Sequence, residues 1–432
     1  MNINGVYTAG VLLCIGAVLI ALCFSVLDTG GKEIDATLEY QDYMEIDSDG
    51  ILGTNGPLEI VTVAGQTYAH AIGTGYAEIV RDDHSVTRLK IVPAKAVLII
   101  MNGQSNAAYY KFDDPPSEQD LSETPTPRIG QAFYFGYPNW IFRHDDADVS
   151  GCKIYDFIDP ATGSVRICDK GPELCRVYNE ETGLKTIWIS LGIPSKRIAA
   201  WDQPSGSAWT QNKRVMEAAN ALLKDMKFEI VETVVFWAQG ESDYIHSTGY
   251  QHYITSFNAL KTGAPAAWGH EINHWYLIEG RTARVGWVND AFKELAQQHS
   301  DVSIAVDASL IDSFSTDNGL MESDDLHYSQ RGDNAVANRA ARYATNAGGI
   351  APVYLVQDIV VVSAGDEITP PTIATAYRTD GTTGKAFVQW EAQPDASQPG
   401  TQVIDGTADI DPTMTLPKIP VVLIATIEEI SE

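Results

Sequence analysis

Three short stretches of the sequence carry residue types that together could hydrolyse an ester. Ser105 lies in Val-Leu-Ile-Ile-Met-Asn-Gly-Gln-Ser-Asn (97–106), Gln239 in Phe-Trp-Ala-Gln-Gly-Glu-Ser-Asp (236–243), and His327 ends Asp-Asp-Leu-His (324–327). The first two are short apolar runs that end in a glycine-bearing loop, a pattern that predicts buried strands of a parallel sheet. The serine is therefore expected at the carboxyl edge of that sheet, where chemistry gathers in open α/β folds.

The chemistry that this set supports is nucleophilic attack by a serine. A hydroxyl group is a weak nucleophile until a base removes its proton, and His327 is the candidate base. Asp324, three residues earlier, can reach Nδ1 of this histidine while Nε2 faces Ser105, which would fix the tautomer and stabilise the imidazolium. Asp325 is the competitor, but its side chain is expected to point away from the imidazole.

The order of these motifs resembles the SGNH hydrolases, and more narrowly the sialate O-acetylesterase-like carbohydrate esterases. That family's pattern includes Gly-Gln-Ser-Asn, Gln-Gly-Glu-Ser and Asp-x-x-His, and the segment 187–201 is similar to its strand–glycine–tryptophan segment. The resemblance covers roughly residues 95 to 348. It implies a three-layer, flavodoxin-like α/β domain with a parallel sheet, an acetylated carbohydrate as substrate, and an acyl-serine intermediate formed without a metal or an organic cofactor. The catalytic residues that it implies are Ser105, Asp324 and His327.

An oxyanion forms when an ester is attacked, and it needs preorganised donors. The candidates at strand ends are the N–H groups of Ser105 and Gly192 and the side-chain amide of Gln239, and the resemblance implies the same trio. Gly171 is the runner-up for the glycine, because Gly192 is followed by Ile193 where the family has a second glycine. The side chains expected to support the site are Gln104, Asn106 and Glu241.

Two carboxylates close to Gln239 are compatible with a different reaction, the hydrolysis of a glycosidic bond. Glu241 and Asp243 could act as acid and base across a glycosidic bond. That reading leaves the serine and histidine motifs without a role, so ester hydrolysis is favoured, with Glu241 orienting the loop through buried hydrogen bonds.

Composition narrows the function classes. The chain has 432 residues, 44% of them hydrophobic, so it can bury the cores of several domains. Its formal net charge of −28 argues against a nucleic-acid partner and suits a soluble extracellular protein. The five cysteines form no Cys-x-x-Cys motif, which disfavours a structural metal. Cys152, Cys168 and Cys175 cluster together, and both one disulfide and three reduced thiols remain open.

The chain divides by composition into four predicted units. Residues 1–30 contain the uncharged run Gly5–Leu27, long enough to cross a bilayer; a membrane anchor is favoured over a cleaved signal or a helix packed in a surface assembly. Residues 31–94 predict a small β module, 95–350 the α/β domain, and 351–432 a sandwich that resembles bacterial Ig-like surface domains. In the α/β domain, strands are predicted at 96–101, 186–191, 231–237, 274–278 and 302–306, and helices at 211–227 and 331–346. The segment 107–170 is expected to be irregular, its aromatic rings serving either a sugar-binding cleft or a core.

The function predicted from these observations is a cell-surface serine esterase that removes O-acetyl groups from carbohydrate. A surface structural, adhesion or filament protein that uses the same domain to bind glycans is the rival from another class. A viral surface glycan esterase is the third reading, with the protein on a virion. Homo-oligomerisation is left open.

Overall fold

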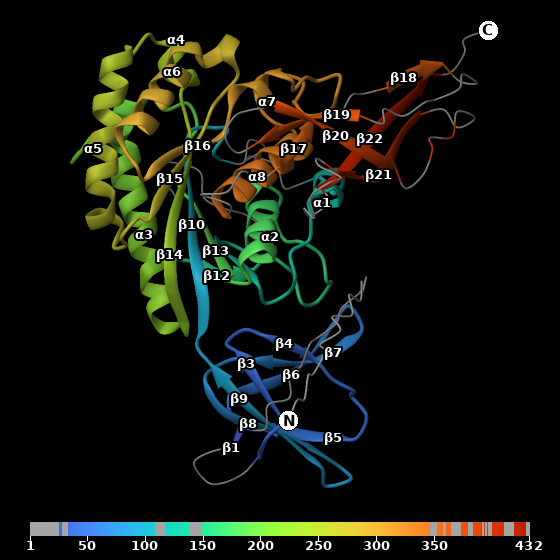
Figure 1. Cartoon of the computed structure of the whole chain (residues 1–432). Helices are drawn as coiled ribbons and strands as arrows, with labels where there is room; N and C mark the ends of the chain where they lie inside the picture. Colours follow the sequence, from blue (N-terminus) through green and yellow to red (C-terminus); the bar gives the residue numbers. More distant parts are fainter. Residues whose placement is uncertain are drawn as a thin grey trace, which may run out of the picture.

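The computed structural model describes residues 26–27, 33–108, 117–138 and 148–345, followed chiefly by six strands between residues 352 and 428 (Figure 1). Most of the predicted anchor Gly5–Leu27 lies outside these ranges. Its last two residues form β1 (Val26–Leu27), which pairs antiparallel with β2 (Glu33–Ile34). Among the helices of the described ranges, none has both the length and the apolar composition needed to span a membrane.

A seven-stranded sheet organises the chain, with the strand that leads to Ser105 in its middle. Its order is β12-β11-β13-β10-β14-β15-β16, and all neighbours are parallel except the edge pair β11–β12. The strands are β10 (Ala94–Gly103), β11 (Ala132–Gly136), β12 (Lys153–Asp156), β13 (Lys185–Ser190), β14 (Phe228–Ala238), β15 (His274–Ile278) and β16 (Val302–Val306). The run β13-β10-β14-β15-β16 has the 2-1-3-4-5 order of flavodoxin-like sheets. The predicted α/β fold with a parallel sheet is confirmed.

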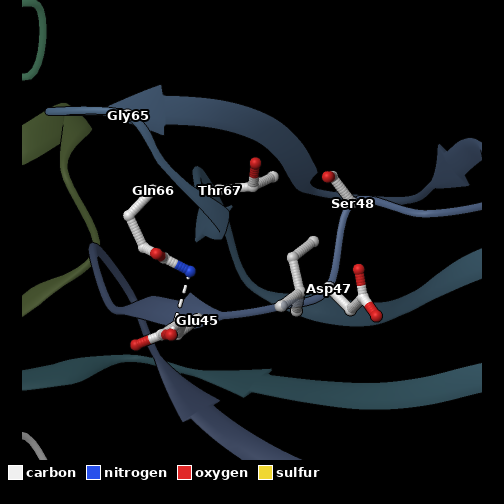
Figure 2. Close-up of a pocket in the computed structure, with 7 residues that line it drawn as sticks. Glu45, Asp47, Ser48, Gly65, Gln66 and Thr67 are labelled. Atoms are coloured by element: carbon white, nitrogen blue, oxygen red, sulfur yellow. Dashed lines mark hydrogen bonds between the residues drawn. The ribbon is translucent and has the colours of Figure 1, made fainter.

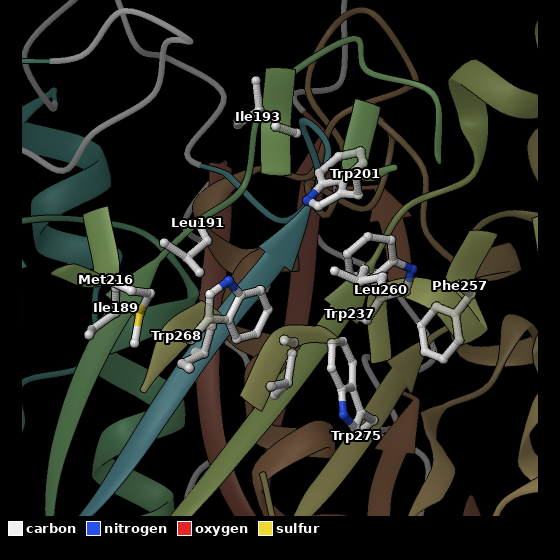
Figure 3. Packing of buried hydrophobic residues seen from close by; sticks show 14 of the residues in the cluster. Ile189, Leu191, Ile193, Trp201, Met216, Trp237, Phe257, Leu260, Trp268 and Trp275 are labelled. Atoms are coloured by element: carbon white, nitrogen blue, oxygen red, sulfur yellow. The ribbon is translucent and has the colours of Figure 1, made fainter. Parts of the chain in front are cut away.

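Helices cover both faces of this sheet. Successive residues of a strand point to opposite faces, and Leu98 and Ile100 join one buried cluster while Val97 and Ile99 join another. The first cluster, rich in tryptophan (Figure 3), packs α3 (Ser207–Asp225), α5 (Tyr250–Trp268) and α6 (Thr282–Gln298) on the sheet. The second packs α2 (Lys170–Thr182) and α8 (Gln330–Thr345). The short helices are α1 (Glu118–Glu123), η1 (Ile198–Trp201), α4 (Glu241–Ile245) and α7 (Ala308–Asp312).

The expectation of an irregular segment over 107–170 is wrong in its middle. This segment supplies α1, the edge strand β12 and its neighbour β11. Phe133, Tyr134 and Phe135 are at most 2% exposed and lie in the two core clusters. These three rings therefore build the core and are not available as a sugar-binding platform.

The β module before β10 is a small pair of packed sheets. One sheet has the order β3-β9-β8-β5 and the other β4-β7-β6, and apolar residues of both form one buried cluster. The strands are β3 (Ala36–Glu39), β4 (Tyr43–Glu45), β5 (Ile51–Asn55), β6 (Leu58–Val63), β7 (Gln66–Ala71), β8 (Gly75–Arg81) and β9 (Val86–Val92). Only Pro93 separates β9 from β10.

The module is also fastened to the amino end of the central sheet. Nζ of Lys185, at the start of β13, lies 2.7 Å from Oδ1 of Asp42 and donates to the carbonyl oxygen of Gly130 at 2.6 Å. Gln131 donates to the same Asp42 oxygen at 3.1 Å. The Lys185 side chain is 1% exposed, so this contact is a buried junction between the two units.

The C-terminal strands form one six-stranded sheet, in the order β17-β19-β20-β21-β22-β18. They are β17 (Pro352–Val356), β18 (Val360–Ser363), β19 (Ile373–Arg378), β20 (Thr383–Trp390), β21 (Gly400–Asp409) and β22 (Ile419–Glu428). Neighbours are antiparallel except β18 and β22. A sandwich needs a second sheet facing the first, which these six strands do not supply, so the Ig-like unit stays a prediction.

The clustered cysteines are three separate thiols. Cys152, Cys168 and Cys175 are all buried, and no disulfide bond joins any two of them. Burial raises the pKa of the Cys175 thiol to about 12, so that side chain is neutral and inert at physiological pH. Of the two alternatives that the sequence leaves open, the structure has the reduced one.

Candidate active site

Ser105 lies on a tight turn directly after β10. Gly103 has φ +132°, and a Cβ at this position would lie 1.9 Å from the carbonyl oxygen of Ala238 at the end of β14, so only glycine fits. The backbone N–H of Gln104 donates to that same carbonyl at 3.0 Å, and the carbonyl of Gln104 accepts from Ala107 at 2.8 Å. These bonds hold the serine, 9% exposed, at the carboxyl edge of the sheet.

The predicted base and its carboxylate meet in the loop before α8. Nδ1 of His327 lies 2.6 Å from Oδ2 of Asp324, and the backbone N–H groups of His327 and Leu326 donate to Oδ1 of Asp324 at 3.0 and 2.9 Å. Partial burial opposes ionisation of this carboxyl group, but the hydrogen bonds from His327 and Leu326 outweigh it and lower the Asp324 pKa to about 2. Asp324 is therefore an anion at any pH at which an esterase would work, and it holds Nδ1 as the protonated nitrogen.

The neighbouring Asp325 is used differently. Its backbone has φ +52°, and its carboxylate pairs with Arg281 at 2.7 Å. Arg281 also donates to the carbonyl oxygens of Asp325 and Phe314. Asp325 thus anchors the histidine loop to the rest of the domain, and its side chain is directed to the guanidinium group.

Asn106 joins the serine turn to the histidine loop. Its Nδ2 donates to Oε1 of Glu241 at 2.7 Å and to the carbonyl oxygen of Leu326, next to His327, at 3.3 Å. Within the described residues Ser105 Oγ makes no hydrogen bond, with His327 or any other group. Catalytic hydrogen bonds often tighten only when substrate binds, and Asn106 already holds the two loops together.

Glu241 therefore supports the site as a structural partner of Asn106. Burial raises the pKa of its carboxyl group, while the hydrogen bond from Asn106 and the nearby His327 oppose that rise. Asp243 is fully buried and accepts from the backbone N–H of Ile198 at 2.8 Å. Both carboxylates are engaged in holding loops, which leaves no acid–base pair facing across an open cleft as a glycosidase requires.

Gly192 packs directly against the serine turn. A Cβ added there would lie 2.8 Å from the backbone nitrogen of Ala108 and 2.9 Å from the carbonyl carbon of Ala107. In the described part of the chain, the N–H groups of Ser105 and Gly192 donate to no protein acceptor. Two backbone donors predicted for the oxyanion are thus placed on adjoining segments. Gly171, the alternative glycine, lies within α2 against Phe157 and Trp188.

A buried amide network under these segments was not foreseen from the sequence. Asn102 donates to Asn212 Oδ1 at 3.1 Å, and Asn212 donates to the carbonyl oxygen of Leu191 at 2.8 Å. The indole of Trp201 donates to Asn212 Oδ1 at 2.9 Å. The network links the ends of β10 and β13 to α3 and η1, and so fixes the spacing of Ser105 and Gly192. The sequence gives one indication of this network, which is the polar residue Asn102 directly after the apolar run 96–101.

Gln239 lies at the end of β14, where it was predicted, but its amide is already engaged. Its Nε2 lies 3.0 Å from the carbonyl oxygen of Lys196 and 3.2 Å from Oε1 of Gln104, and donates in a short hydrogen bond to Asp243. An amide nitrogen has only two protons to donate. The structure therefore does not present this amide as a free oxyanion donor.

A buried charge cluster lies behind the histidine loop. Nζ of Lys170, 1% exposed, contacts Asp333 of α8 closely and lies 5.0 Å from the ring centroid of Tyr328. Asp169 caps α2 by accepting from the backbone N–H of Lys170 at 2.5 Å. Burial raises the pKa of Asp169 to about 7. The cluster ties the amino ends of α2 and α8 together immediately beside His327.

A hollow in the β module carries no comparable set of side chains. A cavity of about 610 Å³ in the β module is lined by Glu45, Asp47, Ser48, Gly65, Gln66 and Thr67 (Figure 2). There Gln66 donates to Glu45 at 2.9 Å, and the lining includes neither a histidine nor a lysine that could act as base to Ser48. In the ranges described above, no three His, Cys, Asp or Glu side chains are grouped to hold a metal ion.

Neither a protein-family model nor a curated protein matches the sequence. Among solved structures, an Arabidopsis thaliana protein is similar with TM-score 0.40 and 15% identity, over 59% of this chain and 99% of its own. A carbohydrate acetylesterase from Xanthomonas citri is similar with TM-score 0.39 and 14% identity, over 90% and 89%. A lipase/acylhydrolase from Enterococcus faecalis has TM-score 0.31 and 10% identity, over 58% and 95%. All three TM-scores are below 0.5, so these likenesses establish neither the fold nor the function.

Proposed function

We propose that this protein is a serine esterase that removes acetyl groups from carbohydrate. The observation that carries the proposal is the hydrogen bond of 2.6 Å between Asp324 and Nδ1 of His327, in a loop that Asn106 ties to the turn of Ser105. An anionic carboxylate on Nδ1 leaves Nε2 as the basic nitrogen, which is the arrangement that activates a serine.

The reaction would proceed in two halves. Ser105 Oγ attacks the ester carbonyl carbon while His327 takes the hydroxyl proton, and the backbone N–H groups of Ser105 and Gly192 stabilise the oxyanion. The sugar alcohol departs with the proton held by His327, which leaves an acetyl group on Ser105. Water, activated by the same histidine, then attacks this ester and releases acetate and free serine.

The substrate class and the location are further parts of the proposal. Carbohydrate is favoured by the resemblance of the four motifs to carbohydrate esterases, and the net charge of −28 disfavours strongly anionic polymers. A surface location is favoured by the apolar run Gly5–Leu27. Intact cells that express the chain should release acetate from an acetylated polysaccharide too large to enter them; release from lysed cells only would contradict the surface location.

The purified protein tests the activity itself. It should hydrolyse p-nitrophenyl acetate and release acetate from acetylated sugars, whereas Ser105→Ala should lose this activity. The variant should keep its thermal unfolding midpoint, because a hydroxyl group that makes no hydrogen bond in the described residues adds little to stability. Hydrolysis by a folded Ser105→Ala protein at the wild-type rate would refute the proposed nucleophile. Failure of the wild-type protein with every acetyl ester would refute the proposed activity.

A further inference from the structure

We propose that the side-chain amide of Gln104 is the third oxyanion donor, in the role for which the sequence favours Gln239. This inference rests on the proposed esterase function and adds a catalytic residue to it. It follows from the orientation of two amide groups, each of which is fixed by its neighbours.

The orientation of the Gln104 amide is set by the start of α4. Oε1 of Gln104 accepts hydrogen bonds from the backbone N–H groups of Gly240 at 3.3 Å and Ser242 at 3.2 Å. Because backbone N–H groups can only donate, the atom that faces them must be the oxygen. Nε2 is therefore directed to the other side of the amide, away from the N–H groups of α4.

The nitrogen of this amide is available to a ligand. Gln104 is 3% exposed, yet within the described residues its Nε2 donates to no protein acceptor. The backbone of Gln104 is held on both sides, by its N–H bond to Ala238 and by its carbonyl bonds to Ala107 and Ala108. The result is a fixed donor on the residue next to the nucleophile, which would not need to reorganise when negative charge develops.

The hydrogen bonds that the Gln239 amide already makes exclude it as the third oxyanion donor. The carboxylate of Asp243 is fully buried and accepts from Gln239 Nε2, and the carbonyl of Lys196 accepts from the same nitrogen at 3.0 Å. Turning this amide toward an oxyanion would deprive a buried carboxylate of one of its two hydrogen-bond donors, which is costly. Gln239 is thus a positioning residue: it donates to Gln104 Oε1 at 3.2 Å and helps to fix that amide.

Paired substitutions separate the two glutamines. Gln104→Met should lower kcat for p-nitrophenyl acetate by about 10²–10³-fold with little change in KM, because an oxyanion donor acts in the transition state. Gln239→Met should lower the thermal midpoint and reduce kcat by no more than about tenfold. The inference would be overturned if Gln104→Met kept the wild-type kcat. It would also be overturned if Gln239→Met lost more kcat than Gln104→Met.

Gln104→Glu provides a second measurement that does not depend on how Gln104→Met folds. It keeps the acceptor oxygen for Gly240 and Ser242 and replaces the donor by an anion, which can donate again only when protonated. Its kcat relative to wild type should therefore rise as the pH is lowered from about 8 to about 5. A ratio that stays constant over this range would also overturn the role of Gln104. Wild-type protein that hydrolyses no ester would instead be a failure of the proposed function.

Discussion

Nδ1 of His327 lies 2.6 Å from Oδ2 of Asp324, and the two residues belong to the same short loop. The backbone of that loop donates two further hydrogen bonds to the same carboxylate. A single turn of chain thus supplies the base, its orienting anion, and the bonds that keep the anion ionised.

Replacing Asp324 by Asn should therefore impair catalysis much more than folding. The amide would no longer favour a proton on Nδ1, and kcat/KM should fall by about 10³–10⁴-fold. The matched control is Asp325→Asn, since that carboxylate pairs with Arg281 and asparagine tolerates its positive φ. Equal losses of kcat/KM in the two variants would contradict the assignment of Asp324.

Gly192→Ala should disturb the serine turn. Its Cβ would lie under 3.0 Å from backbone atoms of Ala107 and Ala108, which cannot rotate away. We expect kcat/KM to fall by at least about tenfold, because a shift of this turn misplaces an oxyanion donor. Gly286→Ala in α6 is the control, because its Cβ meets nothing within 4 Å. The free energy of unfolding of this variant should be unchanged or slightly larger than that of the wild type. A fully active Gly192→Ala enzyme would show that Gly192 is remote from the reaction.

Lys170→Met should destabilise the fold. It leaves Asp333 buried without its cationic partner, and breaking such a pair typically costs about 3–5 kcal/mol. Lys213→Met removes the exposed partner of Glu217 at 3.8 Å, and should change the free energy of unfolding by less than about 1 kcal/mol. Urea unfolding of both variants measures the difference, and similar values would show that the Lys170 pair adds nothing.

Asp169 should make stability depend on pH between about 4 and 7. In the unfolded chain this carboxyl loses its proton near pH 3.8, whereas in the fold it keeps the proton up to about pH 7. The folded state binds more protons in this window, so the free energy of unfolding falls as the pH rises through it. Asp169→Asn keeps the oxygen that caps α2, and in this variant the free energy of unfolding should fall less steeply as the pH rises. Parallel pH profiles of the two proteins would refute this account.

Much of the fold could be predicted because its strands are continuous apolar runs. β15 and β16 coincide with the predicted ranges, and β10, β13 and β14 differ by a few residues at their ends. β11 and β12 were missed, since they lie at one edge of the sheet in a segment of mixed polarity. The pairing of β11 with β13 joins residues more than fifty positions apart, which local patterns do not reveal.

The sequence identifies residues that the structure brings close together, but it does not predict how their side chains are oriented. The Asp-x-x-His spacing is enough to bring Asp324 to His327 within one turn of chain. The direction of the Gln239 amide could not be predicted, because it is set in part by the carbonyl group of Lys196, which lies 43 residues away in the chain. The same holds for Asn102 and Asn212, which are 110 residues apart in the chain.

The single residue Pro93 between β9 and β10 has a consequence for what the β module can do. Proline restricts the backbone there, Lys185 and Asp42 lock the junction, and the ten residues of β10 then run to the serine turn. At about 3.3 Å per residue, the module and Ser105 are held about 30 Å apart. The module is therefore held at a fixed distance from Ser105. A partner bound to the module would be separated from Ser105 by the length of a strand, and no flexible linker could change that distance.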